Sequence, residues 1–135
     1  MNLLETAKRL AELAEEEARR MNVPITISVV DIHGNIVLKH RMSGALLISI
    51  EMSERKAYTS ASLHMRTEKM TPLVQPGQPL YTLTSTAGGR YVALGGGVPL
   101  RDGEEFVAGV GVSGGTTEQD TIIVEAAFRK LDVAG

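Results

Sequence analysis

The segment GVGVSGG, residues 109–115, is the stretch whose residue types and spacing suggest chemistry most directly. Counted from Gly109 it reads G-x-G-x-x-G, the turn that holds the pyrophosphate of a dinucleotide at the start of a helix. Centred on Ser113 it reads G-x-S-x-G, the turn that exposes the nucleophilic serine of many hydrolases. The same residues therefore match two catalytic patterns, and each pattern makes further demands on the chain.

Neither pattern finds the partners that its chemistry needs. A dinucleotide site requires a second parallel strand after the helix that follows the glycines, and here that helix is expected to be the last element. A hydrolase of this type places its histidine after the serine, whereas His33, His40 and His64 all precede Ser113. A triad assembled in another order stays geometrically open, but we favour neither chemistry.

Alternation along residues 104–113 gives the glycines a structural explanation. In an extended strand Gly109 and Gly111 point to one side and the valines between them to the other. Glycine weakens a strand unless another surface lies close to its backbone. We expect that surface to be a helix with small residues such as Ala57 and Ala61, and a flat ligand or a partner subunit is the alternative.

These residues must be positioned by a mixture of helices and strands, which the hydrophobic periodicity predicts. The expected elements are helices over residues 3–21, 43–64 and from 116 onward, a hairpin over 25–42, and strands at 80–85, 90–97 and 104–113. Tight turns between the strands favour antiparallel pairing. The sequence thus predicts one α+β domain over residues 1–135, in which helices cover a five-stranded antiparallel sheet.

Two helix starts and one helix face can be specified further. Asn2 with Glu5, and Thr116 with Gln119, have the spacing of capping boxes at the first and last helices. The middle helix is expected to turn one stripe of residues inward, namely Leu46, Leu47, Ile50, Ser53, Ala57 and Ala61.

Composition and charge exclude several classes of function. The net charge of −2 provides no basic surface for nucleic acid or anionic lipid. No cysteine is present, which removes disulfides and thiolate chemistry and fits a reducing cytoplasm. No apolar run approaches the roughly 20 residues of a membrane helix. We therefore expect a cytoplasmic protein with no nucleic-acid partner and no membrane partner.

Five segments together resemble a known family. They are VVDIHGNIVLKHRMSGA, RKAYTSA, LVQPGQPLYTL, GGGVPL and GVGVSGGTTEQD, in this order over nearly the whole chain. They resemble the GlcG/HbpS/PduO C-terminal family, and PGQPLY is most similar to the PduO C-terminal type. The resemblance implies a profilin-like fold with a five-stranded antiparallel sheet, and dimers that assemble into tetramers or octamers. It also implies haem binding, and for some members haem degradation. In PduO proteins this module follows a corrinoid adenosyltransferase domain.

The chain departs from the family pattern at three places. His33-Gly34 stands where Gly-Gly is common, and Ser43 stands where aspartate is common. Haem-binding domains of the PduO type are thought to use a histidine in the first helix, and residues 3–21 contain none.

If haem is bound as the resemblance implies, its iron needs an imidazole, thioether or phenolate ligand. The candidates are His33, His40, His64, Met65 and, less directly, Tyr58, with His33 and His64 favoured as metal ligands. Each has a structural alternative. His33 can be a solvated turn residue, His40 a core or interface residue, and His64 a cation at a helix C-terminus.

Anionic groups of a ligand would need donors elsewhere. Arg41, Arg66, Arg90 and the backbone amides of Gly114, Gly115 and Thr116 are chemically suited to propionates or phosphates. Surface solvation or helix capping explains the same residues. The apolar segment around PGQP, with Leu73, Val74, Leu80 and Tyr81, is a candidate subunit interface.

Two hypotheses follow. In the first, the chain is a homo-oligomeric accessory protein that binds a tetrapyrrole, haem or a corrinoid, and a corrinoid adenosyltransferase is a candidate partner. In the second, it is a cofactor-free assembly protein, which the missing first-helix histidine favours. A haem-degrading enzyme, or a small lyase or isomerase using Asp31 with a histidine, has no positive motif.

Overall fold

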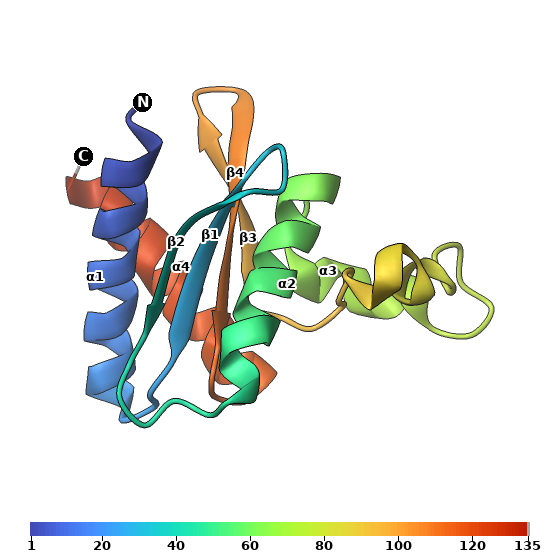
Figure 1. The fold of residues 1–135 in the computed structure, drawn as a ribbon, viewed down its shortest axis with the longest axis horizontal. Coiled ribbons are helices and arrows are strands. Elements are labelled where there is room, and N and C mark those ends of the chain that lie inside the picture. The colour runs from blue at the N-terminus through green and yellow to red at the C-terminus, as the bar shows by residue number, and fades with distance from the viewer. Residues whose placement is uncertain (135) are drawn as a thin grey trace.

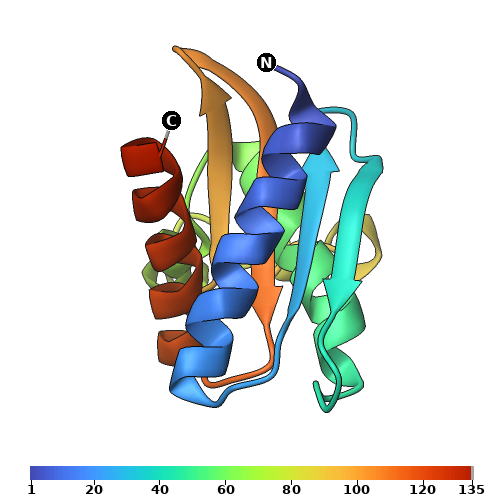
Figure 2. The same cartoon turned by 90° about the vertical axis from the view of Figure 1, so that its left-hand side faces the viewer.

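The computed structural model describes the backbone of residues 1–134 and the side chains of residues 1–132. Its elements are α1 (Leu3–Met21), β1 (Thr26–Asp31), β2 (Ile36–Arg41), α2 (Ile48–Leu63), α3 (Thr67–Met70), the 3-10 turns η1 (Thr71–Val74), η2 (Leu83–Ser85) and η3 (Ala87–Gly89), β3 (Gly97–Asp102), β4 (Glu105–Ser113) and α4 (Thr117–Ala134). The sheet lies between two helical layers, with α1 and α4 on one face and α2 on the other (Figures 1 and 2). None of the helices in this described part is long and apolar enough to cross a membrane.

The sheet has four antiparallel strands in the order β2-β1-β4-β3. In the central pair Thr26 lies opposite Ser113 and Asp31 lies opposite Ala108. We call these two ends of the sheet the Thr26 end and the Asp31 end. They are about 16 Å apart at ~3.3 Å per residue. Of the outer strands, β3 includes Pro99, which lies opposite Gly109.

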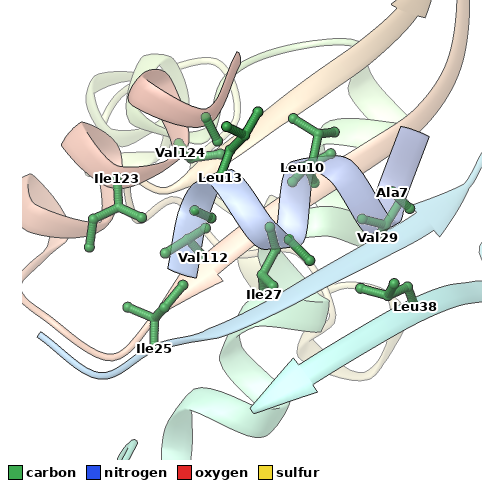
Figure 3. Close-up of a cluster of buried hydrophobic side chains, with 14 of the residues drawn as sticks. Ala7, Leu10, Leu13, Ile25, Ile27, Val29, Leu38, Val112, Ile123 and Val124 are labelled. Atoms are coloured by element: carbon green, nitrogen blue, oxygen red, sulfur yellow. The ribbon is translucent and has the colours of Figure 1, made fainter. Parts of the chain in front are cut away.

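The main hydrophobic core lies between the sheet and the α1–α4 layer. Leu10 of α1 and Val124 of α4 belong to the same buried cluster as Ile27 and Val112 of the central strands (Figure 3). Burying a side chain of this size contributes about 1.5–3 kcal/mol. The predicted capping box at α1 is confirmed on the side of Asn2, whose Oδ1 accepts a hydrogen bond from the backbone of Glu5 at 3.1 Å.

On the other face of the sheet, the backbone of β4 lies directly against the backbone of α2. A Cβ placed on Gly109 would lie 2.0 Å from the carbonyl oxygen of Ala57, and one on Gly111 would lie 2.0 Å from that of Ser53. The hydroxyls of Ser28 and Ser53 are 2.8 Å apart across the same contact. The prediction that a helix explains the glycines is therefore confirmed, and no ligand is needed to account for them.

The predicted fifth strand is wrong. Residues 80–85 form a 3-10 turn and irregular backbone, and residues 90–96 form no strand, so that β3 begins only at Gly97. We call residues 71–96 the arm, because they extend away from the sheet beyond α2 and α3 (Figure 1). Positive φ angles at Gly77, Gly88 and Gly89 bend its backbone. Its hydrogen bonds are mostly local, such as Leu83 N to Leu80 O at 3.0 Å, so the apolar–polar alternation there has no neighbouring strand to pair with.

The middle helix is shorter than predicted at its N-terminus. It starts at Ile48 rather than Ser43, and Leu46 and Leu47 do not turn inward. They are 61% and 77% exposed, and Ile48 is 61% exposed, which forms an exposed apolar corner. The inner stripe is confirmed from Ser53 onward, where it faces the glycines of β4.

Candidate ligand-binding site

His33 lies in the turn between β1 and β2, at the Asp31 end of the sheet. The Asp31 carboxylate accepts hydrogen bonds from the backbone of His33 at 2.9 Å and of Asn35 at 3.0 Å, and Gly34 supplies the positive φ of +85°. The carboxylate of Asp31 thus holds this turn, and the His33 side chain is exposed.

His40 and Arg41 lie on β2 near the Thr26 end. His40 pairs with Ile27 and Arg41 with Thr26 in the ladder. The His40 ring reaches α1, where its Nδ1 is 3.1 Å from a carboxylate oxygen of Glu15. Arg41 donates to the carbonyl of Ala45 at 2.8 Å. Both side chains are therefore already engaged in contacts within the chain.

His64 ends α2 and is held by an aromatic contact. It adopts a left-handed conformation at the C-cap, with φ +56° and ψ +37°, and its ring stacks on Phe106 with centroids 4.0 Å apart. The Arg101 guanidinium lies 4.3 Å from the same Phe106 ring. Met65, the residue after His64, is partly buried. His64 thus lies at the C-terminus of α2, the position that its structural alternative predicted.

The Gly114–Thr116 turn lies at the Thr26 end, and its polar groups form hydrogen bonds with residues of the adjoining helix α4. A Cβ on Gly114 would lie 2.3 Å from the carbonyl oxygen of Pro24. The Thr116 hydroxyl accepts from Gln119 N at 3.1 Å, while the Gln119 side chain accepts from Thr116 N at 2.9 Å, which confirms the second capping box. The Gly115 amide donates to Asp120 at 2.9 Å. These donors are therefore not free for an anion.

The structure does not gather the predicted site residues. His33 and His64 lie at the Asp31 end, whereas His40, Arg41 and the Gly114–Thr116 turn lie at the Thr26 end. Within residues 1–132, no group of three histidine, aspartate or glutamate side chains is arranged to hold a metal ion.

The sequence analysis missed a buried ion pair. Lys56 Nζ lies 2.9 Å from Asp120 Oδ2 and donates to the carbonyl of Val112 at 3.0 Å, and both side chains are 2% exposed. Burial lowers the pKa of Lys56 and raises the pKa of Asp120, and their mutual attraction only partly opposes these shifts. The available signal was the place of Lys56 beside Ala57 on the inner stripe. The pair joins α2 to α4.

Two neighbouring cavities lie where the arm meets α2. The first, which we call the Arg90 pocket, has a volume of about 170 Å³ and is lined by Val30, Gly34, Glu51, Glu54, Arg55, Tyr58 and Arg90. The second, which we call the arm groove, has a volume of about 390 Å³ and is lined mainly by apolar residues, among them Val74, Tyr91, Val92 and Leu94. Arg90 lines the first cavity, and its neighbours Gly89 and Tyr91 line the second. The rings of Tyr58 and Tyr91, one from each, are 5.6 Å apart.

The Arg90 pocket is built from three segments that are distant in sequence. A Cβ on Gly34 would lie 3.2 Å from the Tyr58 ring, so the β1–β2 turn packs directly on α2. Arg55 donates to the carbonyl of Gly89 at 2.5 Å and fixes the arm beside the helix. The Arg90 guanidinium lies 4.3 Å from the centroid of the Tyr58 ring. Of these residues, the sequence analysis named Gly34, Tyr58 and Arg90, but it had no means of placing them together.

Comparisons with known proteins extend over nearly the whole chain. The family model described as "Haem degrading protein HbpS-like" matches residues 3–129. A 15.0 kDa protein from the dhaT-dhaS intergenic region of Citrobacter freundii is 44% identical over 125 residues, 93% of this chain and 88% of that protein. The corrinoid adenosyltransferase PduO of Salmonella typhimurium is 40% identical over 126 residues, 93% of this chain but 37% of PduO.

A solved structure also shows similarity to PduO. The crystal structure of a PduOC:heme complex has a TM-score of 0.90 and 37% identity, and the match covers 93% of this chain and 91% of that chain. The resemblance to the PduO type is thereby confirmed. The chain belongs to the HbpS-like family, and it is similar to part of PduO.

Proposed function

We propose that residues 1–135 form one domain that binds a tetrapyrrole, with haem as the first candidate. The observation that carries this proposal is the likeness to the PduOC:heme complex, at a TM-score of 0.90 and 37% identity. The corrinoid named in PduO is the second candidate ligand, and a corrinoid adenosyltransferase is a candidate partner. We propose a binding and accessory role rather than catalysis, in the cytoplasm.

The arm groove and its surroundings supply part of what haem requires. The apolar wall with Val74, Tyr91 and Leu94 suits a porphyrin face, and Arg90 beside it suits a propionate. No histidine lines this groove within the described chain. His33 adjoins Gly34 of the neighbouring pocket, so it is our first candidate for an iron ligand, and a residue of a second copy is the alternative.

Haem titration followed by Soret absorbance tests the proposal. We expect a shifted Soret band with the wild type and a weaker or altered band with His33→Ala. His40→Ala is a suitable control, because that ring contacts Glu15 on the opposite face of the sheet. No spectral change with the wild type at micromolar haem would refute haem binding. A band that survives both His33→Ala and His64→Ala would refute these two histidine ligands alone.

A cofactor-free assembly protein remains the second candidate function. The exposed apolar corner at Leu46, Leu47 and Ile48, together with Tyr81 of the arm at 53% exposure, favours it. Under this proposal copies of the chain associate as a dimer, tetramer or octamer without a ligand. Light scattering of the ligand-free protein tests this. A monomer at all accessible concentrations would refute it.

A further inference from the structure

One of the charged side chains that line the Arg90 pocket is not matched by an opposite charge. Four charged side chains line it, namely Glu51, Glu54, Arg55 and Arg90, and Lys39 lies next to it as the partner of Glu54. Arg55 pairs with Glu51 at 2.8 Å, and Lys39 pairs with Glu54 at 3.0 Å. Both carboxylates of the pocket are thus matched by a cation.

Arg90 is the cation that is left over. Among the side chains that the structure describes, its guanidinium forms no ion pair, and its contact is with the face of the Tyr58 ring at 4.3 Å. Stacking on an aromatic ring orients a guanidinium while leaving its N–H groups available at the edge. A planar fork of N–H donors held in this way matches the two oxygens of a carboxylate.

The size of the cavity restricts what it can receive. A volume of about 170 Å³ lies below the roughly 300–1,000 Å³ of pockets that hold drug-sized ligands, so the cavity suits a carboxyl group with a few carbon atoms better than a porphyrin ring. Val30 provides an apolar part of the wall for such a short chain.

We propose that the Arg90 pocket is a binding site for the carboxylate of a short aliphatic acid of two to four carbons, held by the Tyr58-stacked guanidinium of Arg90. The carboxylate can belong to a free acid or to the side chain of a larger ligand that lies in the adjoining arm groove. The site does not depend on tetrapyrrole binding, because the Arg55–Glu51 and Lys39–Glu54 pairs form it within one chain.

Sodium propionate is the first probe, followed by ¹H–¹⁵N NMR shifts of the full chain. We expect saturable shifts at Gly34, Gly89 and Arg90. Arg90→Gln should weaken propionate binding at least tenfold, and Arg90→Lys should also weaken it, because lysine keeps the charge but loses the fork. Arg101→Gln is the matched control, since Arg101 also stacks on an aromatic ring at 4.3 Å but lies outside the pocket.

The outcomes separate clearly. No saturable shifts with the wild type, or an equal loss with Arg101→Gln, would overturn the proposal. Folding of each variant is checked by its amide spectrum away from the pocket. Haem and its dimethyl ester then distinguish the two sources. Weaker binding of the ester, and of haem to Arg90→Gln, identifies a side-chain carboxylate, whereas propionate binding without either effect identifies a free acid. Failure of haem to bind at all would refute the proposed function and leave the propionate result intact.

Discussion

The Lys56 ammonium and the Asp120 carboxylate lie 2.9 Å apart, and both side chains are only 2% exposed. The pair connects α2, on one face of the sheet, to α4, on the other, at the Thr26 end of β4. Lys56 also donates to Val112 O, and Asp120 also accepts from the Gly115 amide. Each charge therefore has a second partner, which is the condition under which a buried pair is tolerated.

Removing one member of this pair should be strongly destabilising. Lys56→Met and Asp120→Asn each leave a buried group without its partner, and we expect a loss of about 3–5 kcal/mol in the free energy of unfolding. Urea denaturation measures this loss.

The double variant Lys56→Met/Asp120→Asn, which combines the same two substitutions, is the informative comparison. Because burial opposes the charged form of both groups, the double variant should lose much less than the sum of the two single variants. Lys39→Met is the control, since its partly exposed pair with Glu54 should contribute roughly 0–1 kcal/mol. Additive losses would show that the two groups do not act as a pair.

Adding a single methyl group at the contact between β4 and α2 should destabilise the protein. Gly109→Ala or Gly111→Ala would place a Cβ 2.0 Å from a carbonyl oxygen of α2, so the helix must move. We expect at least ~3 kcal/mol of destabilisation, at the upper end of overpacking effects, measured by thermal or urea unfolding. Gly103→Ala is the comparison. It has positive φ at +64° but nothing within 4 Å, so only backbone strain of about 1–2 kcal/mol is expected. Equal effects at the two sites would contradict the close approach.

The capping box at α4 should make a measurable contribution. Thr116→Ala removes the hydroxyl that accepts from Gln119 N at 3.1 Å, and we expect a loss of about 1 kcal/mol. Thr117→Ala serves as the control because its side chain is exposed, and its effect should stay within about 0.5 kcal/mol. A Thr116→Ala variant as stable as the wild type would refute the role of the hydroxyl.

Glu17 should make stability depend on pH in the acid range. Its side chain is 7% exposed, and the hydrogen bond from Arg20 lowers its pKa below the ordinary value of 4.5. A carboxyl whose pKa is lower in the folded state stabilises the protein above the unfolded pKa, and this contribution is lost as the pH falls through the folded pKa. The stability difference between wild type and Glu17→Gln should therefore be larger at about pH 7 than at about pH 3. Urea titrations at the two pH values measure it, and an equal difference at both pH values would contradict the role of the Arg20 hydrogen bond.

The elements with a regular pattern were predictable, and the arm was not. The helix over 3–21, the hairpin and the glycine strand follow from periods of 3.6 and 2, which burial on one face imposes. The LYTLTS segment also alternates, but alternation alone does not supply a neighbouring strand. The prolines and glycines around PGQP, with positive φ at Gly77, lead the chain away from the sheet instead. The likeness to profilin stays a prediction.

The candidate sites show the same limit more strongly. Lys56 and Asp120 are 64 residues apart, and the Arg90 pocket joins the turn at Gly34 to Arg90 through α2. The place of Lys56 beside Ala57 marks it as a candidate for burial, but nothing in the sequence marks Asp120 as its partner, and Arg90 has the sequence environment of a surface charge. Only the register of the sheet and the packing of α2 bring them together, and neither can be read from spacing in one sequence.

Pro99 has a consequence for how several copies could come together. A proline in a border strand offers no amide proton, so an incoming strand would meet an unmatched carbonyl at that point. Continuous β-ladders from molecule to molecule are thereby disfavoured along this rim. Association through this edge is therefore expected to rely more on side-chain contacts than on backbone hydrogen bonds.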